Sequence, residues 1–423
     1  MKVLVIGSGG REHVIIKSLK KNKLISKLYA APGNGGISRD AECVPVKAAD
    51  IRSMTEFAVK ESLDYVVVAP DDPLAIGMVD ELEKNGIRCF GPNKKAAGIE
   101  SSKVFSKNIM KKYGIPTASY EVFSASDEAR KYLKSANVSF PSVIKADGLA
   151  LGKGVVIAED LNEALAAINE IMDEKKFGES GASVVIEEYL TGHEITVLSF
   201  TDGKNIIPMI SSMDHKRIYD GNKGPNTGGM GVIAPNPHYT EDTAKICEQE
   251  IFLPTVQALK DEGCPFKGCL YFGLMITEKG PKVIEYNARF GDPEAQAVLS
   301  LLETDLLEIM EAVTDERLNE IDIRWKKEHA ACVVLASGGY PSSYKKGIKI
   351  NGLDSDGSGV NEDIAIFHAG TEYKDNAFYT SGGRVLGVTA SGQSLESALN
   401  KAYNAISSIS FEGLFYRKDI GRY

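Results

Sequence analysis

Glu285 and Asn287 are oxygen-bearing side chains two residues apart, in a segment whose β-branched and aromatic neighbours predict a strand. Successive strand side chains face opposite ways, so this pair shares one face while Ile284 and Tyr286 take the other. A carboxylate and an amide oxygen suit Mg2+ that carries nucleotide phosphates, because phosphate and water complete its octahedron. Arg289 adds a planar cation suited to a phosphoryl group in transfer. A half-exposed strand that runs into a polar turn is the alternative.

A glycine turn near the start of the chain, Gly9-Gly10-Arg11, joins a predicted strand to a predicted helix. Backbone N–H groups at such a helix N-terminus favour a phosphate. A dinucleotide fingerprint needs a small residue where this chain has Glu12, whose side chain would crowd the helix against the strand. The turn therefore predicts a monophosphate site with Arg11 as an added cation, and a tight turn of purely structural role is the alternative.

Lys145 lies on a predicted strand where an apolar residue would be expected, so its ammonium group should have a fixed partner. A nucleotide phosphate is the natural candidate. Gly148, Gly152 and Gly154 would let the following loop close over that phosphate and exclude water. Gly154 follows Lys153 where a Walker A loop has Ser or Thr, so the loop is of another kind. A flexible hairpin with a surface lysine is the alternative.

Two further polar segments could bind ligands. Residues 187–194 end one strand, turn at Gly192 and begin another, so their backbone could bind an adenine edge while Glu194 accepts from ribose hydroxyls. A charged hairpin is the alternative. Residues 214–231 read as a long polar loop that cannot build a core, and such loops are usually functional or disordered. This loop suits closure around a small polar substrate, whereas a metal role for His215 would need partners that the sequence does not show.

The elements that would position these residues form several predicted parts. Alternating apolar runs and helical patterns predict a doubly wound α/β unit at the start, followed by α+β segments. A helical stretch over 241–263 is expected to be kinked by Pro254. The predicted parts are 1–101, the α/β unit with a parallel sheet; 102–121 with 190–326, a larger core; 122–189, a compact α+β subdomain; and 327–423, a C-terminal α/β domain.

The composition excludes several classes of protein. At 423 residues the chain is too long for one core. A net charge of −9 argues against a general nucleic-acid binder, although small anionic substrates need only local positive charge. The six cysteines are scattered without metal-ligand spacing, which indicates free thiols in a reducing compartment. We recognise no signal peptide or membrane span, so we expect a cytoplasmic protein, and a monomer, without membrane partners.

Taken together, the motifs resemble the ATP-grasp ligases and, within them, the phosphoribosylamine–glycine ligase family. The resemblance runs from residue 1 to the tail, and the ordered set of motifs is far more specific than any one of them. The matching segments are 7–13, 145–149 with 152–154, 214–217 with 226–231, 285–294, 367–371, 382–388 and 416–421.

The resemblance implies a pre-ATP-grasp N-terminal domain, an ATP-grasp core whose lid subdomain is 122–189, and a C-terminal domain. It implies ligation of glycine to 5-phosphoribosylamine, giving glycinamide ribonucleotide, ADP and phosphate through glycyl phosphate. ATP and Mg2+ or Mn2+ would be the cofactors, and the partners would be these small molecules, not nucleic acid. Phosphorylation supplies the leaving group that a carboxylate lacks, so positioning and charge stabilisation suffice and no nucleophilic side chain is needed.

The resemblance also implies a role for each matching residue, with Arg289, Lys145 and Asp214 closest to the chemistry. The expected metal ligands are Glu285 and Asn287. The expected ATP-binding residues are Lys103, Lys145, Gly152, Lys153, Gly154, Glu187, Glu188, Tyr189, Leu190 and Glu194. The expected substrate-binding residues are Gly9, Gly10, Arg11, Asn34, Gly35, Asp214, Lys216, Thr227, Gly228, Gly229, Met230, Gly231 and Arg289.

Two departures and three rival interpretations accompany the resemblance. Ala69-Pro70-Asp71 stands where the family usually has Gly-Pro-Glu, and residues 273–276 are apolar where many relatives carry an acidic metal ligand. The latter suggests fewer protein ligands. The rivals are another carboxylate–amine ligase or a carboxylase, a nicotinamide oxidoreductase, which Glu12 disfavours, and a non-catalytic nucleotide-binding protein, which the retained ligand and phosphate residues disfavour.

Overall fold

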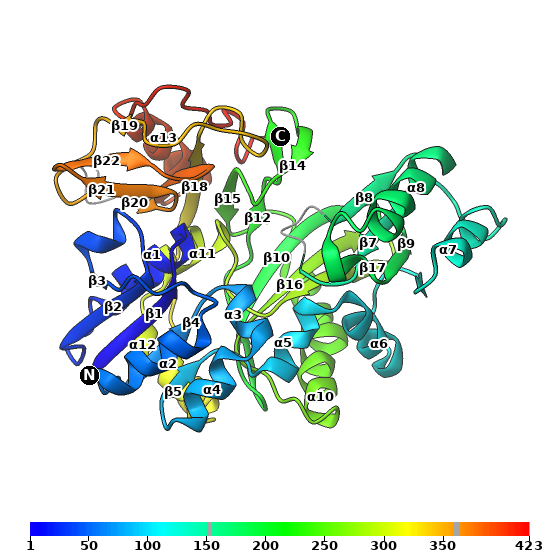
Figure 1. The fold of residues 1–423 in the computed structure, drawn as a ribbon, viewed down its shortest axis with the longest axis horizontal. Coiled ribbons are helices and arrows are strands. Elements are labelled where there is room, and N and C mark those ends of the chain that lie inside the picture. Colours follow the sequence, from blue (N-terminus) through cyan, green and yellow to red (C-terminus); the bar gives the residue numbers. More distant parts are fainter. Residues whose placement is uncertain (150–153, 359–363, 423) are drawn as a thin grey trace.

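The computed structural model describes residues 1–149, 154–358 and 364–422. The first and last parts of the sequence lie against one another in a large body, and a smaller part extends to one side, on the right in Figure 1. Within these described ranges, no helix has the length and apolar character needed to cross a membrane.

The N-terminal part contains the parallel sheet that the sequence predicts, and its strands have the order β3-β2-β1-β4-β5. Residues 3–6 and 65–67 are completely buried, because helices cover both faces of a parallel sheet. The strands are β1 (Lys2–Gly7), β2 (Lys27–Pro32), β3 (Glu42–Cys43), β4 (Tyr65–Val68) and β5 (Arg88–Phe90). The helices are α1 (Gly10–Leu19), α2 (Ile51–Lys60), α3 (Asp71–Ile76), α4 (Met78–Lys84) and α5 (Lys94–Ser101).

The central part is an antiparallel sheet of order β11-β10-β16-β17, which shares a hydrophobic core with one face of the N-terminal sheet. Its strands are β10 (His193–Asp202), β11 (Ile206–Pro208), β16 (Lys267–Thr277) and β17 (Gly280–Asn287). Its helices are α6 (Lys103–Tyr113), α9 (Glu241–Cys247), α10 (Leu253–Asp261), α11 (Glu294–Val298) and α12 (Leu306–Thr314). The helical stretch expected over 241–263 is interrupted by a π-helical turn, Glu248–Phe252, before Pro254. Pro254 lies in the first turn of α10, where its missing N–H is tolerated.

The part that extends to one side is a compact subdomain with its own hydrophobic core. Its antiparallel sheet has the order β6-β9-β7-β8. Asp160 caps α8 by accepting from the N–H groups of Asn162 and Glu163. The elements are β6 (Tyr120–Phe123), α7 (Ser126–Leu133), β7 (Ser142–Ala146), β8 (Val155–Ala158), α8 (Leu161–Ile168) and β9 (Val184–Glu188). The boundary predicted between 121 and 122 therefore falls inside β6.

The C-terminal part is a sheet of order β12-β15-β18-β23-β20, joined by a small antiparallel sheet of order β19-β22-β21. Two of its strands, β12 (Met213–Asp214) and β15 (Gly231–Ala234), come from the segment that the sequence assigned to the central core. Pairing between strands that are distant in the chain leaves no local sequence pattern. The boundary predicted at residue 326 therefore does not separate the central sheet from the C-terminal sheet. The other elements are β18 (His329–Ala336), β19 (Lys349–Ile350), β20 (Ile364–His368), β21 (Thr371–Lys374), β22 (Ala377–Thr380), β23 (Arg384–Gly392) and α13 (Leu395–Ile406).

Residues 214–231 are more ordered than the predicted polar loop. They contain an antiparallel hairpin of β13 (Arg217–Tyr219) and β14 (Lys223–Asn226). Ile218 and Met230 are buried together against Ala336. The expectation that this segment cannot build a core is therefore wrong, because two apolar side chains anchor it.

Candidate active site

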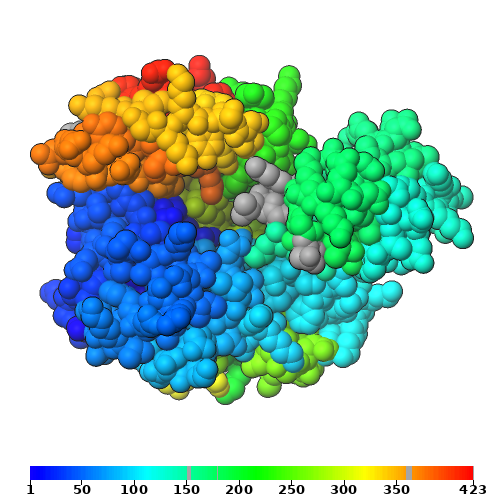
Figure 2. Space-filling view, in the orientation of Figure 1, coloured from blue at the N-terminus to red at the C-terminus, as the bar shows by residue number. Residues whose placement is uncertain are grey.

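The candidate site lies where the N-terminal, central and C-terminal parts meet the subdomain, and Figure 2 shows that the surface is hollowed there. Strand β17 brings Glu285 and Asn287 to this place. They pair with Gly273 and Tyr271 of β16, and the register shifts next to them, so Ile284 is the extra residue of a β-bulge. The expected common face for Glu285 and Asn287 fits this register. Ile284 is half-buried and does not follow the expected alternation, because the bulge breaks it.

The glycine opposite Glu285 provides the room for its side chain. A Cβ atom on Gly273 would lie 3.0 Å from Glu285 Cγ, so any larger residue would press on the carboxylate. Residues 273–276 are apolar where many relatives carry an acidic metal ligand. This segment nevertheless has a role in the site, because Gly273 leaves space for the Glu285 carboxylate on the neighbouring strand.

Several cations surround Glu285. Burial opposes its ionisation, but the ammonium groups of Lys216, Lys145 and Lys103 outweigh burial and lower the pKa of Glu285. Lys216 Nζ lies 3.8 Å from Glu285 Oε1 and also pairs with Glu194. Lys103 Nζ donates a hydrogen bond to the Gly148 carbonyl at 2.8 Å. An ionised carboxylate within a group of lysines is suited to a metal ion that arrives with polyphosphate.

Arg289 is held at the end of β17 by three acceptors, one of which is the Phe290 carbonyl at 3.2 Å. Its guanidinium lies 2.9 Å from Glu100 Oε1 and donates to Asn287 Oδ1 at 3.1 Å. Glu100 also accepts from the Ala288 N–H at 2.7 Å. These bonds fix the plane of the guanidinium beside the carboxylate and amide pair.

The donor set of Glu285 and Asn287 fits a hard divalent ion. An ionised carboxylate and an amide oxygen on one strand face are the ligands that Mg2+ and Mn2+ accept. Among the described residues, no group of three or more His, Cys, Asp or Glu side chains could hold a metal ion. A metal at this place would therefore draw most of its ligands from phosphate and water.

Lys145 is buried and has the fixed protein partner that its position on a strand requires. Its Nζ lies 3.0 Å from Glu187 Oε2 and donates to the Ile284 carbonyl at 3.1 Å. Lys107 Nζ contacts the same Glu187 oxygen at 3.1 Å. The Glu187 side chain therefore faces these lysines, and the expected nucleotide phosphate would be a further partner of Lys145.

The connector after β9 begins with a second engaged carboxylate. Glu188 pairs with Lys282 at 2.8 Å and accepts from the Ser119 N–H. Tyr189 is exposed and Leu190 is partly buried. The turn at Gly192 is possible only without a side chain, because a Cβ there would lie 2.1 Å from the Ile276 carbonyl oxygen and its φ is +149°. The edge of a planar ligand bound at residues 189–190 would contact backbone N–H and C=O groups.

Two acids, the half-buried Asp214 and the buried Glu294, lie between the central and C-terminal parts. Burial, followed by the charge of Glu294, raises the pKa of Asp214 well above its usual range. Burial likewise raises the pKa of Glu294. Asp214 Oδ1 is buried and has no hydrogen-bond partner among the described residues. A carboxyl group that is easily protonated and has an unsatisfied oxygen is suited to hold or move a proton.

The loop after the hairpin packs on these acids. Thr227 Oγ1 donates to the Lys216 carbonyl at 2.9 Å and accepts from the Gly229 N–H at 3.0 Å. A Cβ on Gly229 would lie 2.7 Å from Asp214 Oδ1. The Gly228 carbonyl accepts from Arg384. Met230 is buried in the core and Gly231 begins β15, so only the first part of the predicted substrate loop faces the site.

The glycine turn before α1 already donates hydrogen bonds to one carboxylate, that of Glu12. Glu12 accepts from the Gly9 N–H and from Arg11 Nε, the latter at 2.7 Å. Arg11 also donates to the Phe290 carbonyl at 3.0 Å. The crowding expected from Glu12 is relieved because Gly7 has no side chain: a Cβ there would lie 2.4 Å from Glu12 Cγ. A phosphate at this turn would have to compete with Glu12 for these donors.

Asn34 and Gly35 lie at the junction with the C-terminal part. The Asn34 amide donates to the carbonyls of Ser8 at 2.9 Å and His368 at 2.8 Å, and its oxygen accepts from Ile37 N–H. The Gly35 N–H donates to the Thr371 carbonyl at 2.9 Å. These polar groups join the N-terminal part to the C-terminal part. The expected contact of Asn34 and Gly35 with substrate would therefore be indirect, through the loop whose shape they fix.

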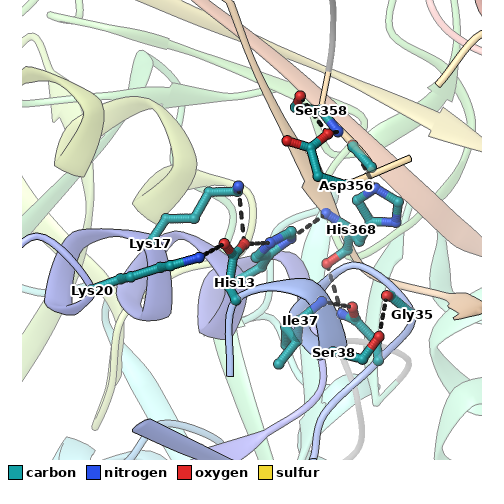
Figure 3. A network of polar contacts seen from close by, with 12 residues as sticks. His13, Lys17, Lys20, Gly35, Ile37, Ser38, Asp356, Ser358 and His368 are labelled. Carbon is teal, nitrogen blue, oxygen red and sulfur yellow. Dashed lines mark hydrogen bonds and ion pairs between the residues drawn. The ribbon is translucent and has the colours of Figure 1, made fainter. Parts of the chain in front are cut away.

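His13 and His368 continue this junction (Figure 3). The His368 N–H donates to His13 Nδ1 at 2.7 Å, so His13 Nε2 carries the proton that is shared with Asp40 at 3.0 Å. Lys17 and Lys20 complete the neutralisation of Asp40. Burial lowers the pKa of His13, and burial lowers the pKa of His368 to about 3. Both rings are therefore neutral structural groups at neutral pH.

Several site residues escaped the sequence reasoning. Lys107 could have been found, since it follows Lys103 by one helical turn. Glu294 and Arg384 lie inside the matching motifs but were given no role, and nothing in the sequence links Glu100 to Arg289. Gly152 and Lys153, which were expected at the nucleotide, lie outside the described residues, whereas Gly154 is described and buried.

Comparison with known proteins gives the arrangement a family. Three family models match in order: the N domain of phosphoribosylglycinamide synthetase at 1–100, its ATP-grasp (A) domain at 101–295 and its C domain at 330–423. Phosphoribosylamine–glycine ligase of Caldanaerobacter subterraneus subsp. tengcongensis is 50% identical over 420 residues, covering 99% of each chain. The Clostridium acetobutylicum ligase of the same name is 49% identical over the full length of both.

Solved structures agree with this assignment. The crystal structure of phosphoribosylamine–glycine ligase from Thermotoga maritima superimposes with a TM-score of 0.87 at 34% identity, covering 99% of this chain and 100% of that one. The biotin carboxylase domain of Hydrogenobacter thermophilus 2-oxoglutarate carboxylase shares the fold at a TM-score of 0.76 and 17% identity, covering 98% and 91%. The expected multidomain α/β architecture with an ATP-grasp core is thus confirmed, and the chain belongs to the phosphoribosylglycinamide synthetase family.

Proposed function

We propose that the chain ligates glycine to 5-phosphoribosylamine at the expense of ATP, giving glycinamide ribonucleotide, ADP and phosphate through glycyl phosphate, a step of purine biosynthesis. The observation that carries the proposal is the ordered group of Glu285, Asn287 and Arg289 beside Lys103 and Lys145, in a chain half identical to ligases of that name over its whole length. This group matches what phosphoryl transfer needs, namely a metal site and fixed cations.

In this proposal ATP lies between the subdomain and the central sheet. Lys103 and Lys145 would hold its phosphates, Gly152, Lys153 and Gly154 would cover them, backbone groups at 189–190 would meet the adenine, and Glu194 would accept from the ribose. Glu285 and Asn287 would hold Mg2+ or Mn2+, which would neutralise phosphate charge. Arg289 would stabilise the phosphoryl group as the glycine carboxylate attacks it.

The second half-reaction would take place beside Asp214 and Glu294. The amine of 5-phosphoribosylamine attacks the acyl carbon of glycyl phosphate, phosphate leaves, and the amine loses a proton. Asp214 would accept that proton directly or through water; its raised pKa supports this role, as does its Oδ1, which has no hydrogen-bond partner among the described residues. The sugar phosphate would lie near Gly9, Gly10 and Arg11.

The test is release of ADP by the purified protein with Mg-ATP and glycine, with and without freshly prepared 5-phosphoribosylamine. Release that requires both co-substrates supports the proposal. Release that is indifferent to both would contradict it and direct the search to another carboxylate and amine. Replacement of Mg2+ by Mn2+ in the same assay tests the metal preference.

We also propose that the chain works as a cytoplasmic monomer on these small molecules, without nucleic-acid or membrane partners. Light scattering after gel filtration is expected to give a mass near the 45.7 kDa of one chain. A mass of twice that value at micromolar concentration would contradict the proposal.

A further inference from the structure

Lys107, Glu187 and Lys145 form a buried group of three charges that the proposed mechanism uses only in part. Lys107 lies on α6, Glu187 on β9 and Lys145 on β7. Both ammonium groups contact the same carboxylate oxygen, Glu187 Oε2, at 3.1 and 3.0 Å. The exposed fractions of the three side chains are 2%, 3% and 6% in that order. Burying two cations with only one anion carries a desolvation penalty in free energy. The retention of this excess positive charge suggests that it has a function.

Hydrogen bonds tie both lysines to consecutive residues of β17. Lys107 Nζ donates to Thr117 Oγ1 at 2.8 Å, and that hydroxyl donates to the Val283 carbonyl at 2.7 Å. Lys145 Nζ donates to the Ile284 carbonyl at 3.1 Å. Residue 284 is the bulge that precedes Glu285, so the group also supports the strand that presents the expected metal ligand.

The sharing of one oxygen determines how much positive charge Lys145 retains. If Glu187 faced Lys145 alone, the two would form a neutral pair with little attraction left for a polyanion. Because Lys107 occupies the same oxygen, the three groups together keep one positive charge. Lys145 is among the cations that lower the pKa of Glu285, so its charge acts on the site.

We propose that Lys107 is a positioning residue for nucleotide binding: by sharing the Glu187 carboxylate it leaves Lys145 oriented and incompletely neutralised toward a nucleotide phosphate. The inference rests on the proposed function only in that Lys145 would bind such a phosphate. Lys107 itself would touch neither substrate nor metal.

The surroundings of Lys107 make its charge sensitive to alkaline pH. Burial lowers its pKa, the Glu187 carboxylate opposes this, Lys145 adds to it, and the resulting pKa is about 8. The other charged or titratable groups that face it are Glu188 and the Tyr120 ring, whose centroid lies 5.3 Å from Nζ. Above that pH the neutral amine would let Glu187 neutralise Lys145.

The experiment measures the Kd of Mg-ATP and Mg-ADP by calorimetry, without glycine or amine, so that no ligation is needed. Lys107→Met is expected to raise both Kd values about tenfold, the scale of losing one charge near a phosphate. Lys107→Arg keeps the charge and is expected to stay within twofold of wild type. Lys111→Met is the matched control, because Lys111 lies one turn further on α6, is exposed, and has its ammonium group 5.8 Å from the centroid of the Tyr120 ring.

A pH series separates positioning from mere support of the fold. Wild-type Kd for Mg-ATP is expected to rise as the pH passes 8, whereas Lys107→Arg stays flat to pH 9.5 and Lys107→Met is weak and flat throughout. In a Glu187→Gln background, where no carboxylate competes for Lys145, Lys107→Met should have little further effect on Kd.

The outcomes distinguish this inference from the proposed function. Unchanged nucleotide Kd in Lys107→Met, or an equal loss in Lys107→Arg, would overturn the inference even if ligation of glycine is confirmed. A lowered melting temperature without a change in Kd would do the same, since it would show a structural role only. Conversely, the expected Kd pattern in a protein whose ADP release ignores glycine would uphold the inference and refute the ligase proposal.

Discussion

The pKa of an individual carboxyl group in this molecule depends on its burial and on the cations around it. Glu285 is held ionised by three lysines, whereas Asp214 and Glu294 are pushed toward the protonated form by burial. One acid is thereby suited to bind a cation and the others to exchange a proton. Their roles follow from environment, not from residue type.

At the residue scale, Glu285→Gln is expected to lower ADP release by on the order of 100-fold or more, the size typical of losing one charge-stabilising group. The fold should survive, because the side chain is 39% exposed and its loss breaks no core packing. Steady-state assay and thermal melting check this. Glu278→Gln, an exposed change in the turn of the same hairpin, is the control. Near-wild-type turnover would remove Glu285 from the mechanism.

Asp214→Asn is expected to lower activity about 100-fold or more, as for a lost acid–base group, while raising the melting temperature at pH 8. Its folded pKa is raised, so the native state binds more protons than the unfolded chain between the two pKa values, and stability falls as pH rises through that interval. Asparagine removes this penalty. The stability gain should vanish below about pH 4, where the unfolded carboxyl is also protonated. The exposed change Asp242→Asn should show no such pH-dependent gain.

At the element scale, β17 shows how one inserted residue organises a site. The bulge at Ile284 directs that residue's carbonyl to Lys145, while Glu285 fits into the space left by Gly273. Under strict strand alternation Ile284 would share the buried face of Tyr286. A bulge is a way to re-aim side chains next to functional sites.

Gly273→Ala is therefore expected to impair activity more than stability. A Cβ 3.0 Å from Glu285 Cγ would displace the carboxylate, and small misplacements at reacting groups can lower rates by about 10–100-fold. The apparent activation constant for Mg2+ should rise with it. Gly98→Ala, in α5 with only a 3.4 Å contact to Phe105, serves as control. An unchanged metal dependence would show that Gly273 has no part in shaping the site.

Features encoded by short-range sequence patterns could be predicted. Contacts between residues that are distant in the chain could not. Apolar runs alternating with helical patterns predicted the N-terminal parallel sheet, and the spacing of Glu285 and Asn287 predicted their common face. The partner of Lys145 was missed because Glu187 is distant in the chain. The anchoring of Ile218 and Met230 was missed because isolated apolar residues in a polar segment give no periodic signal.

At the scale of the whole molecule, the junction between the N-terminal and C-terminal parts depends on neutral histidines. His13 accepts from His368 N–H, and a proton on that acceptor nitrogen would remove the bond. The Asn34 amide bridges the same two parts through the carbonyls of Ser8 and His368. The C-terminal part is thereby attached to the turn that the sequence assigns to the sugar phosphate.

This junction predicts acid sensitivity. The folded pKa values of His13 and His368 are lowered, so the unfolded chain binds more protons once the pH falls below about 6.5, and stability falls with it. The melting temperature is expected to fall between pH 7 and pH 5. His13→Gln should lower the melting temperature at pH 7 but make it depend less on pH. The exposed change His193→Gln should leave the pH dependence of the melting temperature unaltered. Equal slopes in wild type and His13→Gln would contradict this account.

The insertion of β15 between β12 and β18 has a consequence for biosynthesis on the ribosome. Strand β15 ends at residue 234, but its partner β18 begins at 329, so roughly a hundred residues must be translated before that edge is covered. At ~5–20 residues per second this amounts to about 5–20 s in which a nascent chain carries an open, apolar strand edge. Such an edge is a template for pairing with neighbouring chains. A polypeptide released after residue 328 would keep it permanently and is expected to aggregate, whereas the complete polypeptide covers it.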